Sequence, residues 1–177
     1  MTSAIHILNG LTSKIVQLDR LTRNVETVYR VPVSVIQSNL QLVRAFDQSR
    51  KQYNSTALLA LLFNQSDTPD VKSILIVDVD LFIPILTFVF GEAQLNGRAA
   101  VVSTHRLRNE FYGLTTDESV ASVRLEKEVI HELGHTFGLY HCRQFECVMR
   151  SSTYVEEIDL KRAGLCTNCS SILRQLS

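Results

Sequence analysis

One stretch near the C-terminus constrains this chain more than any other, HELGHTFGLYHCRQFECVM, which runs from His131 to Met149. His131 and His135 are four residues apart, so on a helix their imidazoles lie on one face and can bind the same ion. Gly138 allows the chain to leave that helix with a positive φ, and the turn could bring His141 to the ion as well. If these side chains share one ion, the fold must bring all three together.

Three neutral nitrogen ligands and an open fourth position are typical of a catalytic zinc site. Glu132 adjoins the first histidine and could take a proton from a water molecule without binding the metal itself. The alternative is an ordinary helix with solvated histidines. The complete pattern arises by chance with a probability on the order of 10⁻⁵, so we predict zinc bound by His131, His135 and His141 with Glu132 as general base.

The cysteines predict a second metal site. All four lie close to one another near the C-terminus, at Cys142, Cys147, Cys166 and Cys169. Four thiolates in two close pairs suit a closed, tetrahedral, structural zinc site. The alternatives are two disulfides, which a cytosolic chain disfavours, or a redox Cys-x-x-Cys, which normally opens a helix in a thioredoxin-like setting. Because Cys142 directly follows His141, neighbouring residues would bind different metals.

Composition narrows the class of protein. The chain has 177 residues, of which 45% are hydrophobic and 20% charged, so we expect one catalytic domain over residues 1–177. Its formal net charge is zero, which favours neither nucleic acid nor an anionic membrane as a partner. No secretory signal is evident. No membrane-spanning segment is evident either, because Asp78, Asp80 and Pro84 interrupt the most apolar stretch. We therefore expect a cytoplasmic monomer.

The apolar periodicity predicts strands that alternate with helices. We expect strands at 3–9, 31–36 and 73–83, helices at 13–30, 54–65 and 115–139, and one more helix near 155–163. Residues 39–46 fit a short helix or a loop. Asn96-Gly97 predicts a hairpin turn, Asn54 or Ser55 an N-cap, and Thr115 with Glu118 a capping box. The acidic residues of the last helix are expected on a solvated face: Glu156, Glu157 and Asp159.

The histidine pattern, followed by Met149, resembles the metzincin clan of zinc metalloproteases, and the four cysteines make the resemblance to the archaemetzincins close. The resemblance covers most of the chain. It implies an α/β (α+β) fold of metzincin-like zincin type, with a twisted mixed sheet, a backing helix and an active-site helix. It also implies an upper lobe at about 1–138 and a small lower lobe at about 139–177, with a cleft between them.

The same resemblance implies how the site works. Met149 would form an apolar floor below the metal and would not be a ligand. An edge strand within 88–95, paired with 97–103, would bind a peptide or protein substrate by strand addition. Two zinc ions per chain, one catalytic and one structural, would be the cofactors.

Two other functions fit the same ligands. One is a non-catalytic zinc protein that binds a peptide or partner in the same cleft, and the other is a zinc hydrolase acting on a non-peptide bond. Several further residues invite a functional interpretation, and we favour packing for Tyr154, a surface role for His105 and structural roles for His6, Asp78 and Asp80.

Overall fold

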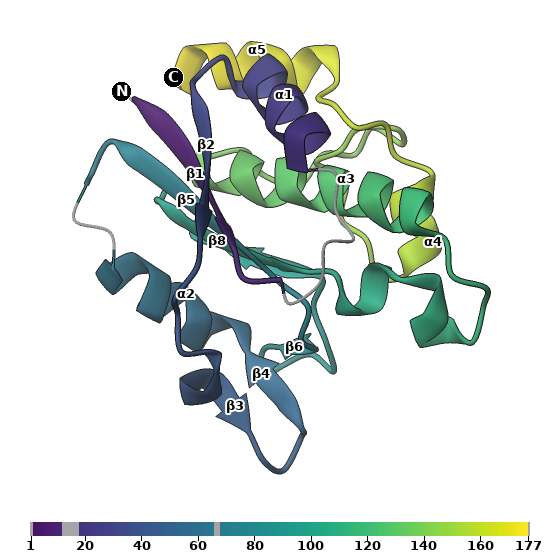
Figure 1. Ribbon diagram of the computed structural model, residues 1–177. Helices are drawn as coiled ribbons and strands as arrows, with labels where there is room; N and C mark the ends of the chain where they lie inside the picture. The colour runs from purple at the N-terminus through teal and green to yellow at the C-terminus, as the bar shows by residue number, and fades with distance from the viewer. Residues whose placement is uncertain (1, 12–17, 66–67, 177) are drawn as a thin grey trace.

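The fold is known from a computed structural model, which describes residues 2–11, 18–65 and 68–176 (Figure 1). Its main element is a five-stranded mixed sheet with the strand order β2-β1-β5-β8-β7. The strands are β1 (Ala4–Asn9), β2 (Val33–Gln37), β5 (Val71–Val77), β7 (Gly91–Ala93) and β8 (Ala99–Ser103). All pairs are parallel except β7 with β8, so a short antiparallel strand forms one edge.

The hairpin predicted at Asn96-Gly97 is confirmed. It joins β7 to β8, and Asn96 has φ 50°, a left-handed conformation that asparagine tolerates in tight turns. Because Asn96 also donates its backbone N–H to the carbonyl of His135, at 2.9 Å, the turn is tied to the end of the helix that carries the histidines.

The strand expected over 73–83 is partly wrong, because β5 ends at Val77. The chain then turns, and β6 (Leu81–Phe82) joins a separate three-stranded sheet with β3 (Phe46–Asp47) and β4 (Gln52–Asn54). Asp80 lies directly before β6, and its carboxylate is held by hydrogen bonds from Arg106 at 2.6 and 2.8 Å. The ambiguous stretch 39–46 contains a 3₁₀ helix at Leu42–Ala45.

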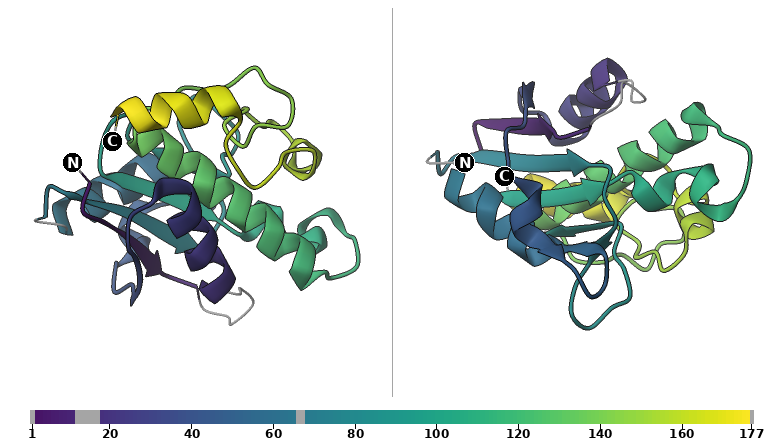
Figure 2. Two further views of the ribbon diagram at one scale, coloured as in Figure 1. Left: turned by 90° about the horizontal axis from the view of Figure 1, so that it is seen from above. Right: turned by 60° about the horizontal axis from the view of Figure 1, so that its bottom comes forward.

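Five α-helices surround the sheets in the described part of the chain, namely α1 (Leu18–Tyr29), α2 (Ser55–Gln65), α3 (Glu118–Thr136), α4 (Val155–Asp159) and α5 (Thr167–Leu176). The strand residues alternate between two cores. Ile74 and Ile76 of β5 face α1 and α3, whereas Leu75 and Val77 face α2. The views in Figure 2 show these helices on opposite faces of the large sheet. Residues 13–17 of the first expected helix lie outside the described residues.

The structure tests two predictions about the residues that cap helix N-termini. Asn54 is the N-cap of α2, because its side chain accepts the N–H of Ala57 at 3.1 Å. The capping box predicted from Thr115 and Glu118 is wrong. Asp117 is the N-cap of α3, and its carboxylate accepts hydrogen bonds from the amides at positions 119 and 120.

The C-terminal part contains two helices where one was expected. The short α4 ends at Asp159, and α5 was missed. Cys169 and Leu173 of α5 are buried in the same core as the apolar residues of α3, so α5 packs beside α3. None of the helices described is long and apolar enough to cross a membrane.

Candidate active site and metal centres

His131 and His135 lie one turn apart near the end of α3, and the backbone holds both rings. Nδ1 of His131 donates to the carbonyl of Val148, and Nδ1 of His135 donates to that of Leu139, each at 2.8 Å. A carbonyl oxygen can only accept, so both protons must sit on Nδ1. The Nε2 lone pairs are therefore left free for a ligand.

The third histidine reaches the site by the turn at the end of α3. Gly138 has φ 91°, where glycine is favoured, and the amide of Leu139 donates to the carbonyl of Gly134 at 2.9 Å. After this turn the ring of His141 lies 5.3 Å from that of His131 and 4.9 Å from that of His135, between centroids. The turn at Gly138 therefore brings His141 back beside the two helical histidines.

The donor set fits a zinc ion. One nitrogen from each of the three histidines lies within 4.8 Å of the others. The Nε2 atoms of His131 and His135 are 3.1 Å apart, although neither carries a proton to share with the other. Tetrahedral zinc with Zn–N bonds of about 2.0–2.1 Å holds such nitrogens about 3.4 Å apart. Two lone pairs that face each other at this distance are best explained by a cation between them.

Electrostatics keep these imidazoles neutral. Burial lowers the pKa of His131 well below its ordinary value, with smaller contributions from Lys161 and His135. The pKa values of His135 and His141 are also lowered, again chiefly by burial. Neutral imidazole is the form that binds metal, so the fold favours ligation at and below neutral pH.

Glu132 is buried between α3 and the edge strand. A β-carbon at Gly91 would lie 2.9 Å from Oε1 of Glu132, so only glycine at position 91 leaves room for this carboxylate. Burial, followed by the charges of Glu128 and Glu92, raises the pKa of Glu132 well above its ordinary value. A carboxyl group with a raised pKa is suited to taking up a proton, and a nearby dication would favour its charged form.

Met149 lies under the histidine helix. It is fully buried, and a β-carbon at Gly134, one residue before His135, would overlap its sulfur atom. The carbonyl of Met149 accepts the amide of Cys142 at 2.9 Å, so the loop carrying the methionine is tied to the chain just past His141. Its position agrees with the predicted apolar floor.

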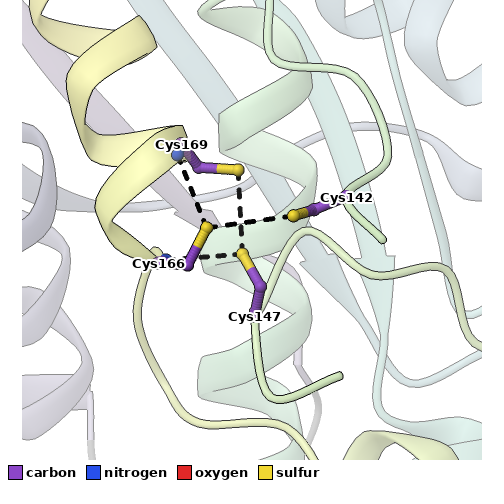
Figure 3. A group of neighbouring side chains, drawn as sticks. All are labelled: Cys142, Cys147, Cys166 and Cys169. Carbon is purple, nitrogen blue, oxygen red and sulfur yellow. Dashed lines mark hydrogen bonds between the residues drawn. The ribbon is translucent and has the colours of Figure 1, made fainter. Parts of the chain in front are cut away.

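The four cysteines converge from two segments (Figure 3). Cys142 and Cys147 lie on the loop after α3, and Cys166 and Cys169 lie at the start of α5, with all four sulfurs pointing toward one another. The Sγ atoms of Cys142 and Cys166 are 3.8 Å apart, as are those of Cys147 and Cys169. These distances exclude disulfide bonds, which need about 2.05 Å.

This cluster also fits zinc. Tetrahedral zinc with Zn–S bonds of about 2.3 Å separates its sulfurs by about 3.8 Å. Backbone amides donate to the sulfurs, from Cys166 to Cys147 at 3.4 Å and from Cys169 to Cys166 at 3.5 Å. Burial opposes ionisation of Cys166, but the Cys169 amide and the neighbouring thiols lower the pKa of this thiol to about 7. A thiolate is the form that binds metal.

Sequence reasoning missed a group of charged residues that join α3 to α4. Arg124 donates to the Asp159 carboxylate at 2.7 and 2.8 Å, so Asp159 is exposed, as predicted, but also has an ion-pair partner on α3. Lys127 donates to the carbonyl of Ile158 at 2.9 Å, at the end of α4. Lys161 and Glu128 form a buried ion pair at 3.4 Å. The only sequence signal was the number of charges on a helix that also has a long apolar face.

Glu92 was also missed. It lies on β7, and its carboxylate accepts hydrogen bonds from the hydroxyls of Ser55 and Thr56 at the start of α2, the latter at 2.9 Å. These hydrogen bonds connect the edge strand β7 to the start of α2.

Several other residues invited a functional interpretation in the sequence. Tyr154 is 66% exposed, so the packing role expected for it is wrong. His105 is partly buried and its ring contacts that of Phe111, with centroids 5.2 Å apart. Asp80 has the structural role described above.

The mixed α/β fold and this site define a class of protein, the zinc metalloproteases. A model of peptidase family M54 matches residues 11–175, and the chain belongs to this family. Among curated relatives, the archaemetzincin of Methanocaldococcus jannaschii is 43% identical over 129 residues, which cover 72% of this chain and 69% of the relative. That of Saccharolobus solfataricus is 35% identical over 162 residues, or 90% of this chain and 87% of the relative.

Crystal structures agree with this assignment. A zinc-dependent peptidase from Methanocorpusculum labreanum superposes with a TM-score of 0.85 at 31% identity, covering 96% of this chain and 99% of that one. The archaemetzincin of Methanopyrus kandleri gives a TM-score of 0.84 at 34% identity, covering 99% and 95%. The metalloproteinase-II of Bacteroides fragilis, at 15% identity and a TM-score of 0.60 over 99% of this chain and 52% of that one, shares the fold alone.

Proposed function

We propose that this zinc metalloprotease hydrolyses peptide bonds with Glu132 as general base and with one catalytic zinc ion held by His131, His135 and His141. The observation that supports this most strongly is the pair of Nε2 lone pairs that face each other at 3.1 Å. Both are fixed by Nδ1 hydrogen bonds to backbone carbonyls. Family membership favours catalysis over the alternative of a peptide-binding or partner-binding protein without activity.

The chemistry divides between the metal and the chain. Zinc in this position supplies Lewis acidity, which polarises a carbonyl group and lowers the pKa of an adjacent water to about 7. Glu132 takes the proton of the attacking water and later passes it to the leaving amine. Its burial beside Gly91 keeps the carboxylate in one place during both transfers.

The edge strand offers a binding surface for the substrate. The carbonyl of Phe90 and the amide of Gln94 are hydrogen-bonded to β8, at 2.8 and 3.0 Å. Backbone groups alternate along a strand, so those of Gly91 and Ala93 point away from the sheet. We propose that a peptide pairs with these groups as an added strand, which places its backbone beside Glu132.

The four cysteines would hold a second, structural zinc ion, which makes two per chain. The peptide bond between His141 and Cys142 would then link the two sites. Because the backbone amide of Cys142 also donates to the carbonyl of Met149, this ion would help to place both His141 and the apolar floor. We further propose that residues 1–177 form one catalytic domain whose upper and lower lobes, about 1–138 and 139–177, meet near Gly138, and that it acts as a cytoplasmic monomer of the metzincin clan.

Metal analysis tests the two-site proposal. Purified wild-type protein should contain two zinc ions per chain, His135→Ala one, and Cys166→Ser one. Only the His135→Ala protein should lose peptide cleavage while its cysteines still bind zinc. A single zinc ion in the wild type, or cysteine disulfides in freshly purified protein, would contradict the proposal.

A further inference from the structure

A cavity that contains none of the candidate metal ligands lies beside the C-terminal end of the active-site helix. It has a volume of about 560 Å³, within the usual size of small-molecule sites. Its walls come from the end of α1, the end of α3 and one side of α5, which are neighbours in Figure 2. The cavity shares no lining residue with the predicted histidine or cysteine sites.

The floor of the cavity is apolar and rigid. The rings of Tyr29 and Phe137 are stacked with centroids 4.7 Å apart and an interplanar angle of 9°. Leu173 adds a buried aliphatic wall. The Tyr29 hydroxyl donates to the backbone carbonyl of Ile130, and burial raises the pKa of this phenol well above its ordinary value, so the floor carries no negative charge.

The charges on the rim have one sign. Arg30 and Arg174 line the cavity, and no aspartate or glutamate in the described ranges does. Among the residues that the structure describes, neither arginine forms an ion pair. Lys72 adds a third cation behind the floor, with its Nζ 4.6 Å from the centre of the Phe137 ring. Two acids lie close to this region without lining the cavity: Glu26, whose carboxylate accepts the backbone amide of Val33 at 3.1 Å, and Asp70, which lines a smaller neighbouring cavity together with Lys72.

The backbone presents Arg30 in a costly conformation. Its amide donates to the carbonyl of Glu26 at 2.8 Å, and its φ is 57° at the position just past α1. Helices usually place glycine or asparagine there. Any other residue is strained in this conformation, and such strain is concentrated at binding sites.

We propose that this cavity binds a small amphipathic organic acid. The apolar body would lie on Tyr29, Phe137 and Leu173, and the carboxylate would lie at the rim between Arg30 and Arg174. Two guanidinium groups without acidic partners select an anionic head, and the apolar floor selects a non-polar body. This site is independent of the peptidase chemistry, so its failure would leave the proposed function untouched.

Binding of decanoate and of decan-1-ol to the zinc-loaded full chain tests the proposal, by isothermal titration calorimetry and by amide chemical shifts. We expect decanoate to bind at least about tenfold more tightly than the alcohol, because a hydrogen bond to a charged group contributes about that factor. The largest shift changes should occur at Val28, Val31 and Leu173.

Variants locate the site. Arg30→Gln and Arg174→Gln should each weaken decanoate binding about tenfold and leave decan-1-ol unchanged. Arg23→Gln, an exposed arginine on α1 that does not line the cavity, is the matched control and should have no effect. Thr27→Trp, on the exposed rim, should block both ligands. Equal affinity for acid and alcohol, an equal loss in Arg23→Gln, or shifts confined to another surface would overturn the proposal.

Discussion

Gly91 of the edge strand and Glu132 of the active-site helix are in direct contact, since a β-carbon at position 91 would lie 2.8 Å from Cγ of Glu132. The same β-carbon would lie 2.7 Å from the carbonyl oxygen of Val101 on β8, so the strand cannot move back to make room. The backbone groups to which a substrate strand would pair and the carboxylate that would act on it are therefore positioned by one glycine.

Gly91→Ala should displace the Glu132 carboxylate and lower kcat by about 10- to 100-fold, because small misplacements of a catalytic group have effects of this size. Zinc content should not change, since no histidine is touched. Gly164→Ala is the matched control, because a β-carbon there meets no atom within 4 Å. If Gly91→Ala and Gly164→Ala hydrolyse a reporter peptide equally fast, the contact has no catalytic role.

Gly134→Ala should destabilise the protein by about 1–3 kcal/mol, because its new methyl group overlaps the sulfur of Met149. In a Met149→Ala background the same change should cost less, since the methyl group then enters the space that the methionine leaves. Denaturant unfolding of the four proteins in this double-mutant cycle measures the coupling. Strictly additive changes in the free energy of unfolding would show that the two residues do not meet.

Asp117→Ala should lower the free energy of unfolding by about 1 kcal/mol, the usual effect of losing an N-cap. Thr115→Ala, at the position that the sequence favoured, should change stability by less than about 0.5 kcal/mol. Thermal unfolding at neutral pH distinguishes them. A larger loss of stability in Thr115→Ala than in Asp117→Ala would contradict the N-cap seen in the structure and support the capping box predicted from the sequence.

Apolar periodicity predicted the large sheet and its helices well, because alternate strand residues such as Ile74 and Leu75 face different cores. It failed where polar contacts decide the geometry. The strand expected over 73–83 stops at Val77, and the hydrogen bonds that hold Asp80 beyond it could not be predicted, because its partners Gln52 and Arg106 are distant in the sequence. Helix α5 was missed because its short amphipathic pattern begins among residues interpreted only as metal ligands.

The candidate site was also predictable only in part. Ligand spacing predicted which histidines and cysteines come together, since helix and turn geometry set those distances locally. The groups that hold them were not predictable in the same way. Nothing in the sequence connects His131 to the carbonyl of Val148, or Lys161 to Glu128, because those contacts depend on how the C-terminal segment packs against α3.

Glu132 should reduce stability in the metal-free protein, and the loss should depend on pH. Its pKa in the folded state lies well above the ordinary value of 4.5. Protonated Glu132 does not lower the free energy of unfolding, so stability is fully present below about pH 4.5. It is lost as pH rises through the folded-state pKa, because the buried carboxyl then becomes charged. Metal-free Glu132→Gln should be about 0.5–2 kcal/mol more stable than wild type at pH 8, with the difference shrinking toward pH 4.5. A difference that grows on acidification would contradict this.

Cleavage of an unbiased peptide mixture, followed by mass spectrometry for wild type and Glu132→Gln at equal zinc content, tests the central claim most directly. Wild type should cut peptide bonds, and the variant should retain two zinc ions but cut about 10²- to 10⁴-fold more slowly, the usual contribution of a general base. Equal cleavage by both proteins, or no cleavage by zinc-loaded wild type, would contradict the account.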